Sequence, residues 1–316
     1  MRSSISSSES SHGKVGIDRF TIVLLSTIVA IVILAECGSR AWFDKTSRVQ
    51  RRELSERHAL LSVRDTQDIV DPHIALLGNS LMLDGVNLTE FGERVGRKYV
   101  PTPYFVLGTN YYDWYFGLKR LFAEGMRPKY VVLGLSPNQL ATSSIRGEMS
   151  ARYLFQRSDL MEVVRKTHMS PTVASEFLLA YYSEYLSTRD TTRGFVMSSV
   201  FPSVGQLLHN EFATFRDPEV EKPVLERVAS ERLGQLNRLC QEYGSHFIFV
   251  IPPTYQKGEQ TIALSGWKEG TRVLVPVRQG EFDSSYYQSD GFHLNDKGAL
   301  IFTARLTDEL KSDLGN

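Results

Sequence analysis

Four short apolar runs without regular polar alternation punctuate the chain from residue 74 onward. They cover residues 74–77, 104–107, 130–135 and 246–251. Runs of this kind are typical of strands that are buried on both faces, as in a parallel sheet. Each run is followed by glycine, proline or small polar residues, which mark the end of a strand.

Helical patterns separate these predicted strands. Residues 112–124 lie between the second and third runs, and residues 223–243, with apolar positions close to helical spacing, precede the fourth. A last helix is predicted over 296–311, with Asn295 as its N-cap. Strands that alternate with helices pair in parallel through right-handed crossovers. The sequence therefore predicts a three-layer, flavodoxin-like α/β sandwich.

Residues 146–215 interrupt this alternation. They contain helix-like segments at 152–168 and 172–187 and no clear strand pattern. We interpret them as a helical insertion packed beside the sheet. Such an insertion is either a simple helical cover or a lid that forms one wall of a substrate site.

The N-terminal region predicts a membrane anchor. Residues 1–19 form a Ser-rich tail that we expect to be disordered, and the uncharged apolar run that follows predicts a transmembrane signal anchor over 20–36. At 1.5 Å per residue this run covers most of a hydrocarbon core about 30 Å thick. A cleaved signal peptide is the alternative, although no small-x-small cleavage site follows the run.

Charged residues dominate the segment after the anchor. Residues 40–70 are predicted to form a juxtamembrane helix or stalk, and residues 71–316 the globular domain. By the positive-inside rule, the basic residues around the anchor favour a cytoplasmic domain. The residues concerned are Arg2, Lys14 and Arg19 before the run and Arg40, Lys45, Arg48, Arg51 and Arg52 after it.

Composition excludes several classes of function. The chain has 36 basic and 36 acidic residues, so it lacks the basic excess that is typical of nucleic-acid binding. Its two cysteines, Cys37 and Cys240, suggest neither a disulfide framework nor a zinc cluster. The sequence shows no metal-ligand spacing and no phosphate-binding glycine loop, so we expect no metal site and no cofactor.

Residues suited to serine chemistry follow the predicted strands. Ser80 comes directly after the first strand, and Asp290 and His293 precede the last helix. A serine nucleophile requires a general base to accept its proton and a carboxylate to orient that base. Because ligands bind outside the carboxyl ends of parallel strands, these residues are expected to gather at one edge of the sheet.

The motifs resemble those of the SGNH (GDSL-like) hydrolases. Residues 78–81 read Gly-Asn-Ser-Leu where the family has Gly-Asp-Ser-Leu, and Asp290 and His293 match its closing Asp-x-x-His block. The resemblance covers residues 74–138 and 246–312. It implies that Ser80 is the nucleophile, His293 the general base and Asp290 the residue that orients the base.

The same resemblance implies an oxyanion hole. Gly108 and Asn138 fall where the family has its oxyanion glycine and asparagine, and Asn110 is a rival donor on the neighbouring loop. Two departures stand out. Asn79 replaces an aspartate, and residues 136–139 read Ser-Pro-Asn-Gln in place of Gly-x-Asn-Asp.

A single N-terminal anchor followed by an SGNH-like domain resembles proteins that handle O-acyl groups, especially acetyl groups, on exopolysaccharides or cell-wall polymers. This layout implies a periplasmic or extracellular domain, against the flanking charges, and a glycan or acyl-ester substrate. A polytopic membrane acyltransferase is the partner that it implies. Ester hydrolysis and acyl transfer share the same chemistry up to the acceptor.

Two other hypotheses come from different classes of protein. A catalytically silent binding or assembly subunit would keep the fold, and the altered residues 79 and 136–139 favour it. An unrelated flavodoxin-like module that binds a small ligand would instead place Ser80 and His293 far apart.

Overall fold

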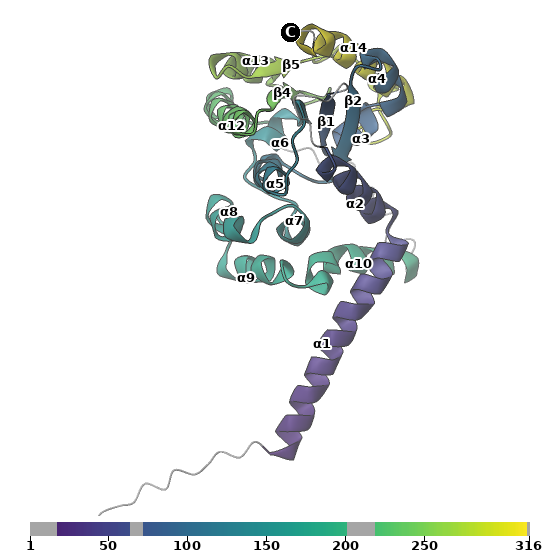
Figure 1. The fold of residues 1–316 in the computed structure, drawn as a ribbon, viewed down its shortest axis with the longest axis vertical. Coiled ribbons are helices and arrows are strands. Elements are labelled where there is room, and N and C mark those ends of the chain that lie inside the picture. Colours follow the sequence, from purple (N-terminus) through teal and green to yellow (C-terminus); the bar gives the residue numbers. More distant parts are fainter. Residues whose placement is uncertain (1–17, 64–71, 201–218, 315–316) are drawn as a thin grey trace, which may run out of the picture.

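The computed structural model describes residues 18–63, 72–200 and 219–314. Its centre is a parallel sheet with the strand order β2-β1-β3-β4-β5 (Figure 1). This arrangement confirms the predicted α/β sandwich. The strands are β1 (His73–Gly78), β2 (Val100–Phe105), β3 (Tyr130–Gly134), β4 (His246–Val250) and β5 (Arg272–Leu274).

Helices cover both faces of the sheet, as two separate hydrophobic cores show. Alternate residues of β1 enter different cores: Ala75 and Leu77 face one, and Ile74 and Leu76 face the other. The first core is covered by α5 (Tyr111–Ala123), α6 (Pro137–Ala141), α12 (Lys222–Glu242) and α13 (Glu259–Lys268), and the second by α3 (Ser80–Gly85), α4 (Leu88–Val95) and α14 (Asp296–Leu314).

The second strand lies earlier in the chain than its apolar run suggested, at Val100–Phe105 instead of 104–107. Two prolines at 101 and 103 conceal it. Val100 N donates to Pro72 O at 3.1 Å and Val106 N donates to Gly78 O at 2.9 Å, both on the β1 side. The backbone nitrogens of the odd-numbered residues between them therefore face away from β1. Proline is tolerated there because β2 is an edge strand.

The fifth strand was not predicted. Only three residues, Arg272–Leu274, pair with β4. A run this short at the edge of a sheet gives no periodic signal that separates it from a loop.

A long apolar helix precedes the domain. Helix α1 (Arg19–Thr46) contains a segment, Arg19–Ala41, which is the one helix among the described residues that is long and apolar enough to cross a membrane. Residues 20–34 expose their side chains, as a segment that contacts lipid would. The predicted tail, except for residues 18 and 19, lies outside the described residues.

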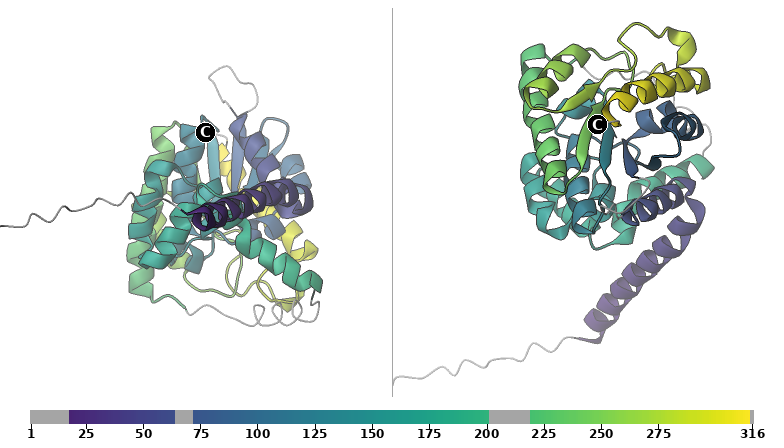
Figure 2. Two further views of the ribbon diagram at one scale, coloured as in Figure 1. Left: turned by 90° about the horizontal axis from the view of Figure 1, so that it is seen from below. Right: turned by 45° about the horizontal axis from the view of Figure 1, so that its top comes forward.

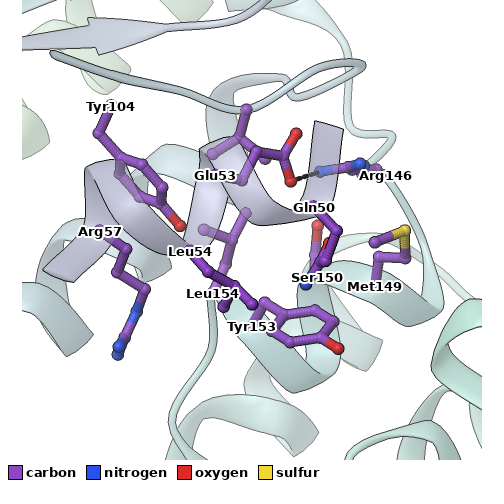
Figure 3. Close-up of a pocket in the computed structure, with 11 residues that line it drawn as sticks. Gln50, Glu53, Leu54, Arg57, Tyr104, Arg146, Met149, Ser150, Tyr153 and Leu154 are labelled. Atoms are coloured by element: carbon purple, nitrogen blue, oxygen red, sulfur yellow. Dashed lines mark hydrogen bonds and ion pairs between the residues drawn. The ribbon is translucent and has the colours of Figure 1, made fainter. Parts of the chain in front are cut away.

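The juxtamembrane segment 48–61 is part of the globular body. It forms α2 (Arg48–Leu61), which packs along β2 at the edge of the sheet (Figure 3). The Glu56 carboxylate accepts from Phe105 N at 2.8 Å, and Glu53 accepts from Leu107 N at 3.2 Å. Glu53 also forms an ion pair with Arg146 at 2.9 Å. The outward-facing N–H groups at this edge, those of Phe105 and Leu107, thus donate to α2. Helix α2 therefore prevents another strand from pairing with this edge.

The insertion is helical, as expected. Its helices gather below α5, on the side of the domain from which α1 departs (Figure 1). Residues 201–215 of the predicted insertion lie outside the described residues. The elements are α7 (Glu148–Tyr153), the 3-10 turn η1 (Arg157–Asp159), α8 (Leu160–Lys166), α9 (Pro171–Ala180) and α10 (Glu184–Val200).

Candidate active site

A tight turn after β1 presents Ser80. Gly78 ends the strand, Asn79 caps α3, and Ser80 is the first residue of that helix. A Cβ atom on Gly78 would lie 2.4 Å from Met82 Cγ and 2.9 Å from Gly134 O, closer than atoms can approach, so the turn requires glycine here. The serine is half-buried at the carboxyl end of the sheet.

Ser80, His293 and Asp290 form one chain of hydrogen bonds. His293 Nε2 lies 2.8 Å from Ser80 Oγ, and His293 Nδ1 lies 2.6 Å from Asp290 Oδ2. An ionised carboxylate only accepts hydrogen bonds, so Nδ1 carries the proton and Nε2 is left to accept from the serine hydroxyl. The unrelated flavodoxin-like module, which required Ser80 and His293 to lie far apart, is therefore wrong.

The Asp290 carboxylate is held in its ionised form. Partial burial would raise the pKa of Asp290, but hydrogen bonds from the His293 ring and from the backbone N–H groups of Phe292 and His293 outweigh burial and lower this pKa below its usual value. The two backbone bonds go to Oδ1, at 2.9 and 3.0 Å. One carboxylate oxygen thus shapes the turn while the other orients the imidazole.

Asn295 fixes this turn to the last helix. Its side-chain amide donates to Ser285 O at 2.8 Å and to Tyr287 O at 3.0 Å, and its Oδ1 accepts from Gly298 N at 3.1 Å. The predicted N-cap of α14 is confirmed by the last contact. The 3-10 turn η2 (Ser284–Tyr286), the His293 loop and α14 are therefore linked through a single side chain.

The sheet order places the candidate oxyanion donors on either side of Ser80. Gly108 follows β2 and Asn138 follows β3, and these two strands flank β1, which carries Ser80. Gly108 has φ +70°, a left-handed conformation that glycine adopts without strain. All three residues therefore follow the same edge of the sheet, as the sequence predicted.

Asn79, which departs from the family pattern, connects the nucleophile turn to the Gly108 loop. Its Nδ2 donates to Thr109 O at 2.9 Å, and its Oδ1 accepts from Leu81 N at 3.0 Å. Thr109 is itself buried, accepting from Trp114 Nε1 at 3.0 Å and donating to Val106 O at 2.6 Å. The amide uses both its donor and its acceptor here, whereas an ionised carboxylate could only accept.

The unusual third block also has a local explanation. Ser136 and Gln139 form a reciprocal capping box at the start of α6: Ser136 N donates to Gln139 Oε1 at 2.9 Å, and Gln139 N donates to Ser136 Oγ at 3.4 Å. Asn138 is buried between them, and its backbone N–H donates to Gln256 Oε1 at 3.2 Å. Gln139 thus replaces the acidic residue of the family pattern with a helix cap.

The rival donor Asn110 is engaged in a neighbouring contact. Its Nδ2 donates to Ser144 Oγ at 3.2 Å, and its backbone N–H donates to Asp113 Oδ2 at 2.8 Å. Asn110 and Asn138 nevertheless line the same open hollow, of about 340 Å³. The hollow is lined mainly by residues that follow β2 and β3, and neither Ser80 nor His293 is among its lining residues.

Asp84 is a neighbouring carboxylate that the sequence analysis missed. It lies four residues after Ser80 in α3, and this spacing, which puts both residues on one side of the helix, was the available signal. Burial raises the pKa of Asp84, while the charge of His293 and a hydrogen bond with Gln288 oppose that effect. The site therefore contains a second acidic group close to the imidazole.

The site brings together a serine hydroxyl, an imidazole, a carboxylate and nearby amide groups. Among the residues that the structure describes, no group of three or more His, Cys, Asp and Glu side chains is placed to hold a metal ion. The arrangement can deprotonate Ser80 through His293 and return the proton to a leaving group.

Comparison with solved structures adds a similarity in fold. No protein-family model matches the chain, and no curated protein matches it. Among solved structures, the crystal structure of TesA is similar over 76% of this chain and 98% of the TesA chain, with 12% sequence identity and a TM-score of 0.39. A similarity of this size carries no information about the reaction or the substrate.

Proposed function

We propose that this protein is a serine-dependent acyl-handling enzyme that hydrolyses or transfers O-acyl groups, in particular acetyl, on a polysaccharide or another cell-envelope glycan. The observation that carries the proposal is the continuous hydrogen-bond chain from Ser80 through His293 to Asp290. A silent binding or assembly subunit has no need for an imidazole held between a hydroxyl and an ionised carboxylate.

In the first half of the reaction, Ser80 Oγ attacks the acyl carbonyl carbon while His293 Nε2 accepts the hydroxyl proton. The tetrahedral oxyanion is stabilised by the backbone N–H groups of Ser80 and Gly108 and by the Asn138 amide. Its collapse breaks the bond to the leaving oxygen, which takes the proton from His293. Each such oxyanion donor typically contributes roughly 10²- to 10³-fold in rate.

In the second half, water or an acceptor hydroxyl attacks acyl-Ser80 while His293 accepts its proton. Collapse of the second tetrahedral intermediate returns this proton to Ser80 Oγ. Hydrolysis and transfer differ only in the acceptor, so the acceptor decides between esterase and O-acetyltransferase. Asp290 keeps Nδ1 protonated throughout and stabilises the imidazolium that forms in each half.

We also propose that α1 is retained as a single-pass anchor and holds the domain on the periplasmic or extracellular side. The resemblance in domain layout supports this side, whereas the basic residues after α1 oppose it. A polytopic membrane acyltransferase that supplies the acyl group is the partner that this layout suggests. A reporter fused to the C-terminus that is active only outside the cytoplasm tests the orientation: an inactive reporter on a stable fusion would overturn it.

The chemistry is tested with the full chain in detergent and an activated acetyl ester. We expect an acetyl adduct on Ser80 by peptide mass spectrometry, absent in Ser80→Ala and strongly reduced in His293→Ala. The lifetime of the adduct in water, compared with its lifetime in the presence of glycans, then separates hydrolysis from transfer. Biological activity that survives Ser80→Ala intact would instead identify a silent binding or assembly subunit.

A further inference from the structure

The end of the apolar helix is fastened to the insertion. The Glu36 carboxylate accepts from Ser183 Oγ at 2.8 Å, from Glu184 N at 2.7 Å and from Tyr185 N at 3.2 Å. These bonds cap the start of α10, where unpaired backbone N–H groups favour a negative charge. Glu36 directly follows the apolar run, so α10 begins at the level where α1 would leave the hydrocarbon core.

Helices α9 and α10 form the layer of the domain that is nearest to the apolar part of α1. In Figure 1 they lie at the bottom of the domain, with α10 beside α1 and α9 extending away from it, while α13 lies at the opposite end. Figure 2 shows α1 leaving the domain in two further views. A bilayer that contains α1 would therefore have its surface beside these two helices.

Large apolar side chains are exposed around this junction. The exposed fraction is 57% for Leu179, 58% for Tyr182 and 43% for Tyr185. Tyr182 directly precedes the three residues that bind Glu36, and Tyr185 is the last of them. Tyrosine is enriched at membrane–water interfaces because its ring prefers the apolar side and its hydroxyl the polar side. Three such side chains within seven residues indicate a surface that is covered in the native setting.

Two arginines near these side chains are already engaged. The Arg157 guanidinium lies 5.7 Å from the centre of the Tyr182 ring. Arg189 lies within 4 Å of three carboxylates, 3.4 Å from Glu176, 3.6 Å from Asp190 and 3.7 Å from Glu148. The guanidinium is thus already paired, which leaves little attraction for anionic head groups. The exposed rings and Leu179 are the features that suit a lipid surface.

We propose that the interfacial face, formed by Leu179, Tyr182 and Tyr185, is seated in the head-group layer of the bilayer that holds α1. The proposal rests on the retention of α1 as a membrane-spanning anchor and is independent of the chemistry of Ser80. The occupant is lipid, because α1 enters the bilayer at the same level. The face and Glu36 together fix the height and tilt of the domain above the membrane.

The test uses nitroxide labels on the full chain in lipid nanodiscs. The background is Cys37→Ser, which removes the exposed thiol, while Cys240 is buried. Single cysteines replace Leu179 and Tyr182 in turn, so that the loss of one native side chain does not decide the result. Ile28→Cys in α1 serves as the control inside the bilayer, and Trp267→Cys on α13, 80% exposed, as the control in water.

Collision of each label with oxygen, which prefers lipid, and with a water-soluble nickel complex reports its depth. We expect the labels at 179 and 182 to lie between the two controls, at the same depth in phosphatidylcholine alone and with phosphatidylglycerol added. If the labels at 179 and 182 are as accessible to the nickel complex as the label at 267, the face is in water and the proposal is overturned. If they are shielded from both reagents, a protein partner covers the face and the proposal is also overturned. If position 28 itself is in water, the anchor is refuted and this face with it, whereas Ser80 acylation is unaffected.

Discussion

The side-chain amide of Asn79 donates to the backbone carbonyl of Thr109 at 2.9 Å, which joins the nucleophile turn to the loop of Gly108. Both residues are fully buried, so the bond is shielded from water. With the bond from Val106 N to Gly78 O at 2.9 Å, it holds the turn that carries Ser80 against the loop that carries Gly108. This relationship makes residue 79 a positioning residue for the proposed reaction.

Asn79→Asp, which restores the Gly-Asp-Ser-Leu block, is expected to impair this protein. An ionised carboxylate would face the Thr109 carbonyl without a donor, which costs about 1–3 kcal/mol of stability. Displacement of the Gly108 loop should reduce kcat by about 10- to 100-fold. A protonated side chain can still donate, so the defect should shrink as the pH falls. Equal or higher activity of the variant at pH 8 would refute this role.

Asp290→Asn is expected to reduce kcat on the order of 10⁴-fold with little change in KM, because an amide can donate to Nδ1 and stabilise the wrong tautomer. Asp283→Asn is the matched control, since this exposed carboxylate on the same loop only accepts from Ser285 N. The two variants should differ by orders of magnitude in initial rate.

Titration of Asp290 also predicts a pH dependence of stability. Its pKa is below the usual value, so its contribution to folding is present above about pH 4 and is lost as the pH falls through the folded-state pKa. In urea denaturation, wild type should exceed Asp290→Asn in stability at pH 7, and the gap should narrow toward pH 3. A gap that widens at acid pH would contradict the assignment.

The ion pair between Glu53 and Arg146 predicts coupling between α2 and the domain. Glu53→Gln keeps an acceptor for Leu107 N but leaves Arg146 without its carboxylate, and we expect a loss of about 2 kcal/mol, less than for a fully buried pair because the Arg146 side chain is 18% exposed. A double-mutant cycle with Arg146→Gln should give a coupling of about 1–2 kcal/mol.

The matched control for that cycle is Glu90→Gln, which disrupts an i,i+4 pair with Arg94 on the more exposed helix α4. Such pairs contribute about 0.3–0.5 kcal/mol. If both glutamate variants unfold at the same urea concentration, the ion pair between α2 and Arg146 contributes no more stability than an exposed pair on one helix.

Asp113 predicts a second pH effect, of the opposite sign. Burial raises the pKa of this carboxyl to about 6, against hydrogen bonds from Ser150, Asn110 N and Arg146 N that lower it. Its contribution to stability is therefore complete below its unfolded-state value of 3.8 and is lost as the pH rises through about 6. The loss amounts to about 3 kcal/mol.

Asp113→Asn removes this titration. The stability difference between wild type and variant should change by about 2 kcal/mol in favour of the variant between pH 4 and pH 7. Urea denaturation of both chains at a series of pH values measures it. Parallel curves would show that Asp113 does not change its protonation in this range.

The fold could be predicted where a continuous apolar run marked a buried strand. The runs at 74–77 and 130–135 gave β1 and β3 because both strands are central and apolar on both faces. β2 was displaced because Pro101 and Pro103 occupy its outward positions, and that tolerance depends on its place at the edge, which local sequence does not reveal. The three residues of β5 carry too little pattern to detect.

For the site, the motifs named Ser80, His293 and Asp290 because their order and spacing suit the chemistry, and the structure brings them within hydrogen-bond distance. Their catalytic role stays a prediction. The contribution of α2 could not be predicted, because Glu53 and Glu56 read as charges of a solvated helix until their partners, the amides of Leu107 and Phe105, are known. These two contacts join residues that are 49 and 54 positions apart in the chain, so no local sequence pattern indicates them.

Only Ser47 separates α1 from α2, and α2 runs antiparallel to β2, since Glu53 meets Leu107 and Glu56 meets Phe105. The strand end that leads toward the Gly108 loop is therefore the end nearer to α1. With α1 in the bilayer, helices α1 and α2 would hold this edge of the sheet at a fixed height close to the lipid. Under the proposed function, a glycan would have to pass close to the membrane surface to be modified, so the distance at which it emerges, and not its concentration in bulk solution, would select the substrate.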